Sequence, residues 1–374
     1  MAKILVLGAH AESLINFRKE MLTDMARTNQ VIACVPDASA TVVEQLNNMG
    51  VEYRNIQLAR TGLNPFADLI SLKALYKLFK SLEVDQVFTY TSKPVIFGSI
   101  AARLAGVKQK YAMITGLGSY FIHTDIKSLL IRSIMSVLYK ISLSFNTKVF
   151  FQNTDDVNDF RRFGIFNDLN RTVMINGSGV NIDHFQPVAL PANKISFLLT
   201  ARLIKAKGIF EYLAAAQKIK QKYPHVEFLL VGWFEDKDEA LNKDQLQAYI
   251  DNNTITFLGK LTDIRLALAQ TSIYVLPSYR EGTPRSVLEA MASGRPIITT
   301  DVPGCRATVI DGDNGFLVPA KNVDALCVAM ERFINNPGLI AKMGQRSREI
   351  ALEKYDVNKV NKVILDVIGQ NHVS

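Results

Sequence analysis

The sequence predicts an α/β protein built from two doubly wound domains, and three observations support this. Short apolar runs alternate with helical patterns along the whole chain. Because these runs are apolar on both faces, they are typical of parallel strands that helices cover on each side. The chain of 374 residues exceeds what one core usually serves, and the proline-bearing segment 184–194 divides the runs into two series. We therefore expect one domain over residues 1–185 and a second over residues 186–374.

The apolar runs define the expected strands in chain order. In the first domain they are residues 3–8, 31–36, 86–90, 110–115, 148–153 and 172–177. In the second they are residues 195–201, 226–232, 255–259, 273–277, 297–300 and 315–318. The helical pattern at residues 355–368 could pack on either domain. Ligands of doubly wound folds bind beyond the carboxyl ends of the strands, so we expect a site in a cleft between the two domains.

The composition is that of an ordinary globular protein, with 48% apolar and 21% charged residues. No run approaches the roughly 18 apolar residues of a membrane span, and the short N-terminal run predicts a buried strand rather than a signal peptide. Three scattered cysteines are too few for a disulfide framework or a zinc site. We expect a cytoplasmic protein without a metal site.

The positive charge is concentrated in the first part of the chain. Residues 1–148 contain 17 Lys and Arg against 10 Asp and Glu, while the rest is nearly balanced. This suggests an anionic partner, which could be a lipid surface, a phosphorylated acceptor or nucleic acid. No nucleic-acid-binding module accompanies the charge, so we do not expect nucleic acid as a partner.

The stretch YREGTPRSVLEAMASGRPIITTDVPG, residues 279–304, follows an expected strand. We expect a helix over Pro284–Ser293, with Thr283 as its N-cap and Gly294 as its left-handed stop. The helix would begin at the carboxyl end of a strand, where free backbone N–H groups attract anions and above all a diphosphate. These N–H groups belong to Arg285, Ser286 and Val287.

Two glutamates accompany this helix. Glu281 precedes it, and Glu289 lies one and a half turns inside it. A carboxylate beside a phosphate site suits the acceptance of hydrogen bonds from sugar or ribose hydroxyls. The alternative is that both glutamates are solvent-exposed charges.

Two cations follow the first strand of the second domain, in the stretch ARLIKAKG. Arg202 and Lys207 are therefore expected at a carboxyl end that faces the same site. Two cations there would hold a diphosphate and stabilise the charge that develops as it leaves.

These motifs resemble those of the retaining glycosyltransferases of family 4. The resemblance rests on R-x4-K at Arg202 and Lys207, on the stretch that begins at Glu281, on NGSGVNIDHF at residues 176–185 and on ITFLG at residues 255–259. SLINFR at residues 13–18 and GLGSYF at residues 116–121 resemble the subgroup that builds lipid-linked oligosaccharides and capsules, including bacterial N-acetylgalactosaminyltransferases acting on undecaprenyl-diphosphate-linked sugars. The resemblance implies the GT-B fold, in which two Rossmann-like domains face each other across a cleft.

The resemblance also implies the chemistry. A sugar, expected to be an N-acetylhexosamine, would move with retention from a UDP-sugar to a polyprenyl-diphosphate-linked sugar. A donor phosphate oxygen would take the acceptor proton, so neither a protein nucleophile nor a cofactor is expected. The enzyme would lie peripherally on an anionic membrane surface, at the cytoplasmic face of the cell membrane.

The family's roles can be carried over to individual residues. Arg202 and Lys207 would neutralise the diphosphate, and Glu281 would hold hydroxyls of the transferred sugar. Glu289 would bind the ribose hydroxyls. Main-chain groups of the donor site would contact the base at Gly259 and Leu261, and the sugar or phosphate at Gly282, Thr283, Arg285 and Ser286.

The acceptor side would lie in the first domain. The candidates are His10, Asn16, Arg18, Thr115 and Gly116. The first loop reads Gly8-Ala9-His10-Ala11, where many family members have a glycine pair. His10 could instead be a loop histidine with a structural role.

Two alternatives for the function and two further patterns remain. A UDP-sugar 2-epimerase of the same fold, or a non-catalytic nucleotide-sugar-binding subunit, would share these motifs. The D-x-D sequences at residues 236–238 and 311–313 lie in polar loops, so we do not expect them to bind metal. The segment Lys127–Lys140 has a polar stripe at Ser128, Arg132, Ser136 and Lys140. It is either a core helix of the first domain or a helix bedded in lipid headgroups.

Overall fold

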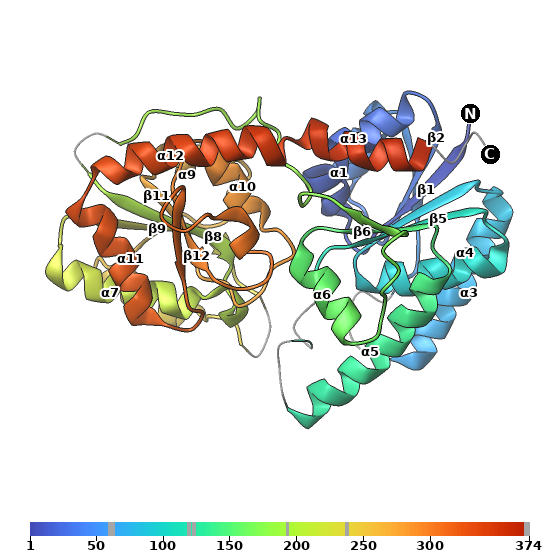
Figure 1. Ribbon diagram of the computed structural model, residues 1–374, viewed down its shortest axis with the longest axis horizontal. Helices are drawn as coiled ribbons and strands as arrows, with labels where there is room; N and C mark the ends of the chain where they lie inside the picture. The colour runs from blue at the N-terminus through green and yellow to red at the C-terminus, as the bar shows by residue number, and fades with distance from the viewer. Residues whose placement is uncertain (59–63, 118–120, 122–124, 192–193, 236–238, 370–374) are drawn as a thin grey trace. The chain divides into compact units, whose positions relative to one another are not determined.

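The computed structural model describes the chain except for residues 59–63, 118–120, 122–124, 192–193, 236–238 and 370–374 (Figure 1). The described chain forms two compact units. Unit 1 is Met1–Ser178 together with the segment that begins at Asn358, and unit 2 is Gly179–Val357. The chain thus passes from unit 1 to unit 2 before the boundary expected at residue 185, and it returns for its last helix.

Unit 1 begins with strands and helices in strict alternation. They are β1 (Lys3–Leu7), α1 (Ala11–Ala26), β2 (Gln30–Val35), α2 (Ala40–Asn48), β3 (Val51–Asn55), α3 (Pro65–Leu82), β4 (Gln86–Tyr90), the π-helical turn η1 (Pro94–Gly98), α4 (Ser99–Ala105), β5 (Gln109–Ile114), α5 (Ile126–Ser144), β6 (Lys148–Phe151), α6 (Thr154–Arg162) and β7 (Thr172–Met174). The strands form one parallel sheet in the order β3-β2-β1-β4-β5-β6-β7. The order reverses between β1 and β4, which is the switch point of a doubly wound sheet.

Each face of this sheet has its own core. Along β1, Ile4 and Val6 join the core that includes residues of α1 and α2, whereas Leu5 and Leu7 join the core that includes residues of α3, α4 and α5. Successive side chains of a strand point to opposite faces, so a strand covered on both sides must be apolar throughout. This is why continuous apolar runs marked the strands.

The last helix, α13 (Val357–Gly369), packs on unit 1. Val360, Ile364 and Ile368 lie in the same core as Leu14 and Met21 of α1. Of the two placements left open by the sequence, the structure has the helix on the first domain.

Unit 2 contains β8 (Ser196–Arg202), the short 3-10 turn η3 (Lys205–Lys207), α7 (Ile209–Lys222), β9 (Glu227–Trp233), α8 (Lys243–Asp251), β10 (Thr256–Phe257), α9 (Arg265–Ala269), β11 (Ile273–Leu276), α10 (Arg285–Ala292), β12 (Ile297–Thr300), η4 (Arg306–Thr308), β13 (Gly315–Val318), α11 (Val323–Asn335), α12 (Gly338–Ile350) and η5 (Ala351–Tyr355). Its parallel strands are ordered β10-β9-β8-β11-β12-β13, with the reversal between β8 and β11. The predicted fold class, α/β with two doubly wound domains, is confirmed in both units.

A buried arginine fixes the segment that leads into β8. Arg295 is 1% exposed and donates to the carbonyl oxygens of Val188, Ala189 and Leu268, at 3.0, 3.3 and 3.1 Å. Burial lowers the pKa of Arg295 to about 10. One guanidinium therefore ties the segment before β8 to the body of unit 2.

The sequence analysis missed one strand and misplaced one helix start. β3 was not expected, because its residues VEYRN are mostly polar and partly exposed at the edge of the sheet. Helix α10 begins at Arg285 with Pro284 as its N-cap, so the assignment of Thr283 as N-cap was wrong. Gly294 does follow the helix in the left-handed conformation, at φ 73°. Among the helices in the described part of the chain, none is long and apolar enough to cross a membrane.

Candidate functional site

The candidate donor site lies at the switch point of unit 2. β8 and β11 are neighbours in the sheet, and their connections leave toward opposite sides. Arg202 is the last residue of β8, and the loop that contains Glu281 follows β11. Because parallel strands end at one edge, the predicted diphosphate and sugar residues are brought together there.

Lys207 and Glu281 form an ion pair at this edge. The Lys207 Nζ donates to Oε1 of Glu281, and the two side chains are 20% and 13% exposed. Ser278 also donates to this Oε1, at 2.6 Å. Glu281 is therefore fixed by two donors, and it is not the solvent-exposed charge of the alternative interpretation.

Close backbone packing holds the loops that follow β8 and β12 against the loop that follows β11. Gly208 and Gly304 have φ of 70° and 78°. A Cβ at Gly208 would overlap the carbonyl oxygen of Pro277, and one at Gly304 would overlap the carbonyl oxygens of Glu281 and Gly282. Glycine is required at both positions, for its conformation and for its lack of a side chain.

Arg202 contacts a different carboxylate. Its NH1 lies 3.3 Å from Oε1 of Glu235, which follows β9, the other neighbour of β8. The sequence analysis did not single out Glu235. Its position just beyond the carboxyl end of a strand beside β8 was the signal that could have identified it.

Glu289 lies on α10 and is paired within the helix. Arg285 Nε donates to its Oε1 at 3.2 Å, and the side chains are 13% and 19% exposed. Burial raises the pKa of Glu289, an effect that the positive charge of Arg285 opposes. Glu289 is thus a largely buried carboxylate, which suits a buried hydroxyl partner.

The start of α10 differs from the expected anion site in one respect. The Val287 N–H, predicted to be free, donates to the carbonyl of Pro284 at 3.0 Å. The first turn therefore closes with a hydrogen bond to Pro284, and the Val287 N–H is already occupied. Ser286 instead has a side-chain hydrogen bond with Tyr274, whose pKa burial raises.

The predicted base contacts extend along the same edge. The Gly232 N–H of β9 donates to the carbonyl of Gly259 at 2.9 Å. Gly259 has φ of 68° and open space where a Cβ would lie. Leu261, beyond β10, is partly buried.

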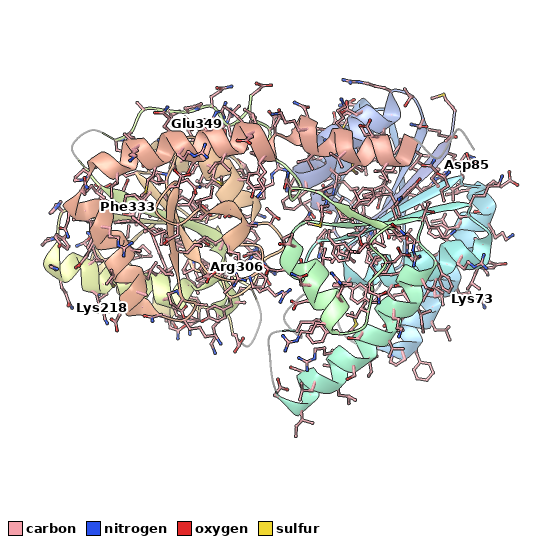
Figure 2. All side chains as sticks on the ribbon, viewed as in Figure 1. Lys73, Asp85, Lys218, Arg306, Phe333 and Glu349 are labelled. Carbon is pink, nitrogen blue, oxygen red and sulfur yellow. The ribbon has the colours of Figure 1, made fainter. Side chains whose placement is uncertain are left out.

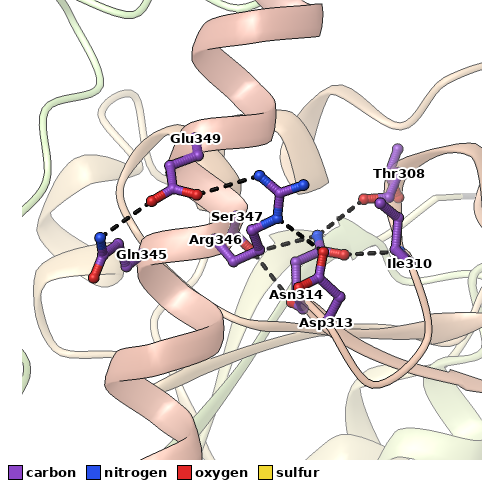
Figure 3. Close-up of polar contacts among 8 residues, drawn as sticks. All are labelled: Thr308, Ile310, Asp313, Asn314, Gln345, Arg346, Ser347 and Glu349. Atoms are coloured by element: carbon purple, nitrogen blue, oxygen red, sulfur yellow. Dashed lines mark hydrogen bonds and ion pairs between the residues drawn. The ribbon is translucent and has the colours of Figure 1, made fainter.

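The described D-x-D sequence is engaged in structural contacts. Asp313 pairs with Arg346 of α12 at 2.8 Å (Figure 3), and Asp311 accepts from the Leu317 N–H at 2.9 Å. The other D-x-D, residues 236–238, lies outside the described residues. Within the described residues no cluster of His, Cys, Asp or Glu is suited to hold a metal ion.

The acceptor-side candidates of unit 1 have different surroundings. His10 precedes α1 and Asn16 lies on it, and both are exposed. Thr115 and Gly116 follow β5 and are partly buried. Because His10 follows β1 and Thr115 follows β5, both lie at the carboxyl edge of the sheet on either side of β4.

Arg18, the remaining acceptor-side candidate, is buried. It is 2% exposed, donates to Met113 Sδ at 2.8 Å and lies over the Tyr90 ring, 5.3 Å from its centroid. Tyr90 shares a hydrogen bond of 2.8 Å with Ser13. Arg18 thus packs against Tyr90, which ends β4 at the switch point, and its acceptor-side role stays a prediction.

Two family models match the chain. The model "Glycosyl transferase 4-like" matches residues 3–153, and "Glycosyl transferases group 1" matches residues 181–350. Together they span most of both units.

Relatives with assigned functions match over nearly the full length. The chain is 29% identical over 360 residues to the N,N'-diacetylbacillosaminyl-diphospho-undecaprenol alpha-1,3-N-acetylgalactosaminyltransferase of Campylobacter jejuni, covering 92% of this chain and 93% of the relative. It is 27% identical over 335 residues to the UDP-Gal:alpha-D-GlcNAc-diphosphoundecaprenol alpha-1,3-galactosyltransferase of Escherichia coli, covering 84% and 82%.

Solved structures share the fold. HepE of Anabaena, in complex with UDP and glucose, aligns with a TM-score of 0.79 at 18% identity, covering 99% of this chain and 100% of that one. The sucrose-phosphate synthase of Thermosynechococcus elongatus aligns with a TM-score of 0.81 at 19% identity, covering 100% and 99%.

Proposed function

Because the chain belongs to the group 1 glycosyltransferases and has the GT-B fold, we propose that it transfers a sugar from a UDP-sugar, with retention, to a polyprenyl-diphosphate-linked saccharide. The transferred sugar would be an N-acetylhexosamine. Both curated relatives described above are named for transfer to diphosphoundecaprenol-linked sugars, which supports the acceptor.

The ion pair of Lys207 and Glu281, at the switch point of unit 2, is the observation that carries the donor proposal. A nucleotide-sugar has an anionic diphosphate on one side of the scissile bond and a sugar rich in hydroxyls on the other. A cation and a carboxylate held side by side suit these two parts. Lys207 would bind the diphosphate, and Glu281 would accept hydrogen bonds from the sugar. Gly282, Thr283, Arg285 and Ser286 line the loop and the helix start beside them.

The transfer balances without a protein nucleophile. The bond between the sugar C1 and the β-phosphate oxygen breaks, and a bond from C1 to the acceptor hydroxyl oxygen forms on the same face. The acceptor proton passes to a phosphate oxygen of the leaving UDP. Arg202 and Lys207 would stabilise the negative charge that develops on that diphosphate.

The remaining candidates complete the proposal. Glu289 would bind the ribose hydroxyls, and the main chain at Gly259 and Leu261 would contact the uracil. The acceptor-side residues would be His10, Asn16, Arg18, Thr115 and Gly116. With a lipid-linked acceptor, the protein would work at the cytoplasmic face of the membrane.

Thermal unfolding with UDP, GDP, ADP and a panel of UDP-sugars, with and without EDTA, tests the donor site. A ligand at 100 times its Kd adds about 2.7 kcal/mol to the unfolding free energy. We expect UDP to raise Tm in the presence of EDTA, and Arg202→Ala and Lys207→Ala to reduce the shift. Lys205→Ala is the matched control, because Lys205 lies on the same turn as Lys207, η3, but is exposed and pairs with Glu239.

The other outcomes separate the alternatives. If no nucleotide raises Tm, the donor proposal is wrong. Binding of UDP-sugars without turnover would support a binding subunit. An epimerised sugar formed without an acceptor would support a UDP-sugar 2-epimerase.

A further inference from the structure

Helices α3 and α5 of unit 1 extend past the sheet that they cover. Short connections join their C-terminal ends to β4 and β6. With 18 and 19 residues, the helices are ~27 and ~28 Å long. β4 and β6 have five and four residues, which span about 17 and 13 Å. The excess length lies at the helix starts, on the carboxyl side of the sheet, and the first turns of α5 stand clear of the sheet in Figure 1.

Both projecting ends expose large apolar side chains. On α3 they are Phe66, which is 81% exposed, Leu69 and Ile70. On α5, Ile126 is 86% exposed and Leu130 is 63% exposed. Apolar side chains of this size are normally buried, and a group of them on one edge marks a surface that contacts another phase or molecule.

The apolar surface continues along the outer side of α5. After Ile126 and Leu130, the exposed residues Ile134, Val137 and Ile141 follow at helical spacing, so the five residues form one stripe. Within the polar stripe, Ser128 is buried and Arg132 lies over the Phe163 ring, while Lys140 is exposed. The outward face of α5 is thus apolar, as is the inward face that Tyr139 and Leu143 bury in the core.

Basic residues accompany the apolar ones. Lys73, Lys77 and Lys80 are exposed on α3, and Figure 2 shows Lys73 on the outer side of that helix. Lys127 and Lys140 are exposed on α5. Asp68 is the only acidic residue within these two helices, and it is paired with Lys93 at 2.6 Å. The surface is therefore apolar and positively charged.

We propose that this projecting surface, made by Phe66, Leu69 and Ile70 of α3 and the α5 stripe, docks unit 1 on an anionic lipid bilayer. Apolar side chains enter the headgroup boundary, while lysines attract the negative surface. A second copy of the chain is a poorer occupant, because a two-fold contact would bring the same lysines toward each other.

The docking surface also fits the proposed function, on which it rests for its biological use. His10, Thr115 and Gly116 follow strands at the same carboxyl edge as the projecting helix ends. A polyprenyl-linked acceptor keeps its chain in the bilayer and its sugars at the bilayer surface. Docking by this edge would bring those sugars to unit 1.

Flotation of the full-length protein with vesicles tests the proposal. One set of vesicles contains phosphatidylcholine and phosphatidylglycerol, and the other phosphatidylcholine alone; neither contains a polyprenyl lipid. We expect flotation with the anionic set, weakened by added salt. The double variant Leu130→Ser and Ile134→Ser should lower the partition coefficient about tenfold or more.

A matched control lies in the same unit. Leu104 is 59% exposed near the end of α4, which leads into β5 and so lies toward the amino edge of the sheet. Leu104→Ser should float like the wild type. Equal loss in both variants, or no flotation of the wild type, would overturn the proposal. The proposal would also be overturned if the wild type bound no vesicles and instead formed a dimer that the double substitution converts to a monomer.

UDP binding at the proposed donor site provides a test that is independent of flotation. The double variant should retain the UDP-induced rise in Tm, which shows that it is folded. If the wild type floats but no nucleotide shifts its Tm, the proposed function fails while the docking surface stands. If UDP shifts Tm but flotation does not depend on α5, the docking surface fails alone.

Discussion

At the scale of single residues, the proposed donor site depends on groups that hold its candidate residues in place. Ser278 is fully buried and donates to Glu281 at 2.6 Å, while its own carbonyl accepts from the Thr300 hydroxyl. Ser278 thereby connects β12 to the carboxylate proposed to hold the sugar. We expect it to act as a positioning residue, with a role that can be separated from that of Glu281.

We expect Ser278→Ala to lower kcat/KM for transfer about tenfold, because a hydrogen bond to a charged group is worth about 1.5–3 kcal/mol. The affinity for UDP, which lacks the sugar, should change little. The control is Ser272→Ala, which removes an equally buried hydroxyl that accepts from the Ser196 N–H at the opposite end of β11. Steady-state kinetics with unchanged kcat/KM in Ser278→Ala would contradict the role.

Gly304 offers a second test of the same loop. In Gly304→Ala the new Cβ would overlap the carbonyls of Glu281 and Gly282, so the loop must move and kcat/KM should fall at least about tenfold. Gly312→Ala is a close control, since Gly312 has the same φ of 78° but open space around a Cβ. It should show only the backbone cost of about 1–2 kcal/mol in unfolding free energy. Equal transfer rates in the two variants would exclude a positioning role for Gly304.

Glu289 should make stability depend on pH. Burial raises its folded-state pKa, so the folded state holds the proton more tightly than the unfolded state. The stability contributed in this way is present at low pH and is lost as pH rises through the folded-state pKa. As pH rises from acidic to neutral, the unfolding free energy of Glu289→Gln should therefore increase relative to that of the wild type. The same substitution should weaken UDP binding.

Urea unfolding of both proteins across that pH range measures the difference. A constant difference between Glu289→Gln and the wild type would show that Glu289 has no raised pKa in the folded protein.

At the scale of elements, strands covered on both faces were predictable and edges were not. β1 and β8 are continuous apolar runs because two cores use them. β3 was missed because an edge strand is buried on fewer sides and can remain polar. The ends of α10 were displaced by one residue at each terminus, since capping depends on local dihedral angles that residue types only partly determine.

The segment before β8 should depend on Arg295. Removing its guanidinium would leave the carbonyls of Val188, Ala189 and Leu268 buried without their donor. We expect Arg295→Ala to lower the unfolding free energy of unit 2 by about 3 kcal/mol or more. Amide hydrogen exchange, followed separately for each unit, measures this loss of stability. Arg306→Ala, at an exposed position, is the control. Equal protection of unit 2 in Arg295→Ala and in the wild type would contradict the prediction.

At the scale of the whole molecule, the sequence predicted both sheets and the carboxyl edge where the candidate donor residues lie. It could not predict the direct pairing of Lys207 with Glu281, nor the contact of Arg202 with Glu235, because side-chain partners depend on loop conformations. It also could not reveal which apolar residues of α5 stay exposed. That follows from which helix face the sheet covers, and the helical pattern alone is compatible with either.

The most direct test of the account is the anomeric configuration of the product. The protein, with a panel of α-linked UDP-N-acetylhexosamines and a short-chain polyprenyl-diphosphate saccharide, should form one new linkage, and NMR coupling constants should identify it as α. Lys207→Ala should form little of it and Lys205→Ala a normal amount. A β-linked product, or no transfer from any UDP-sugar, would contradict a retaining transfer from the site built around Lys207 and Glu281.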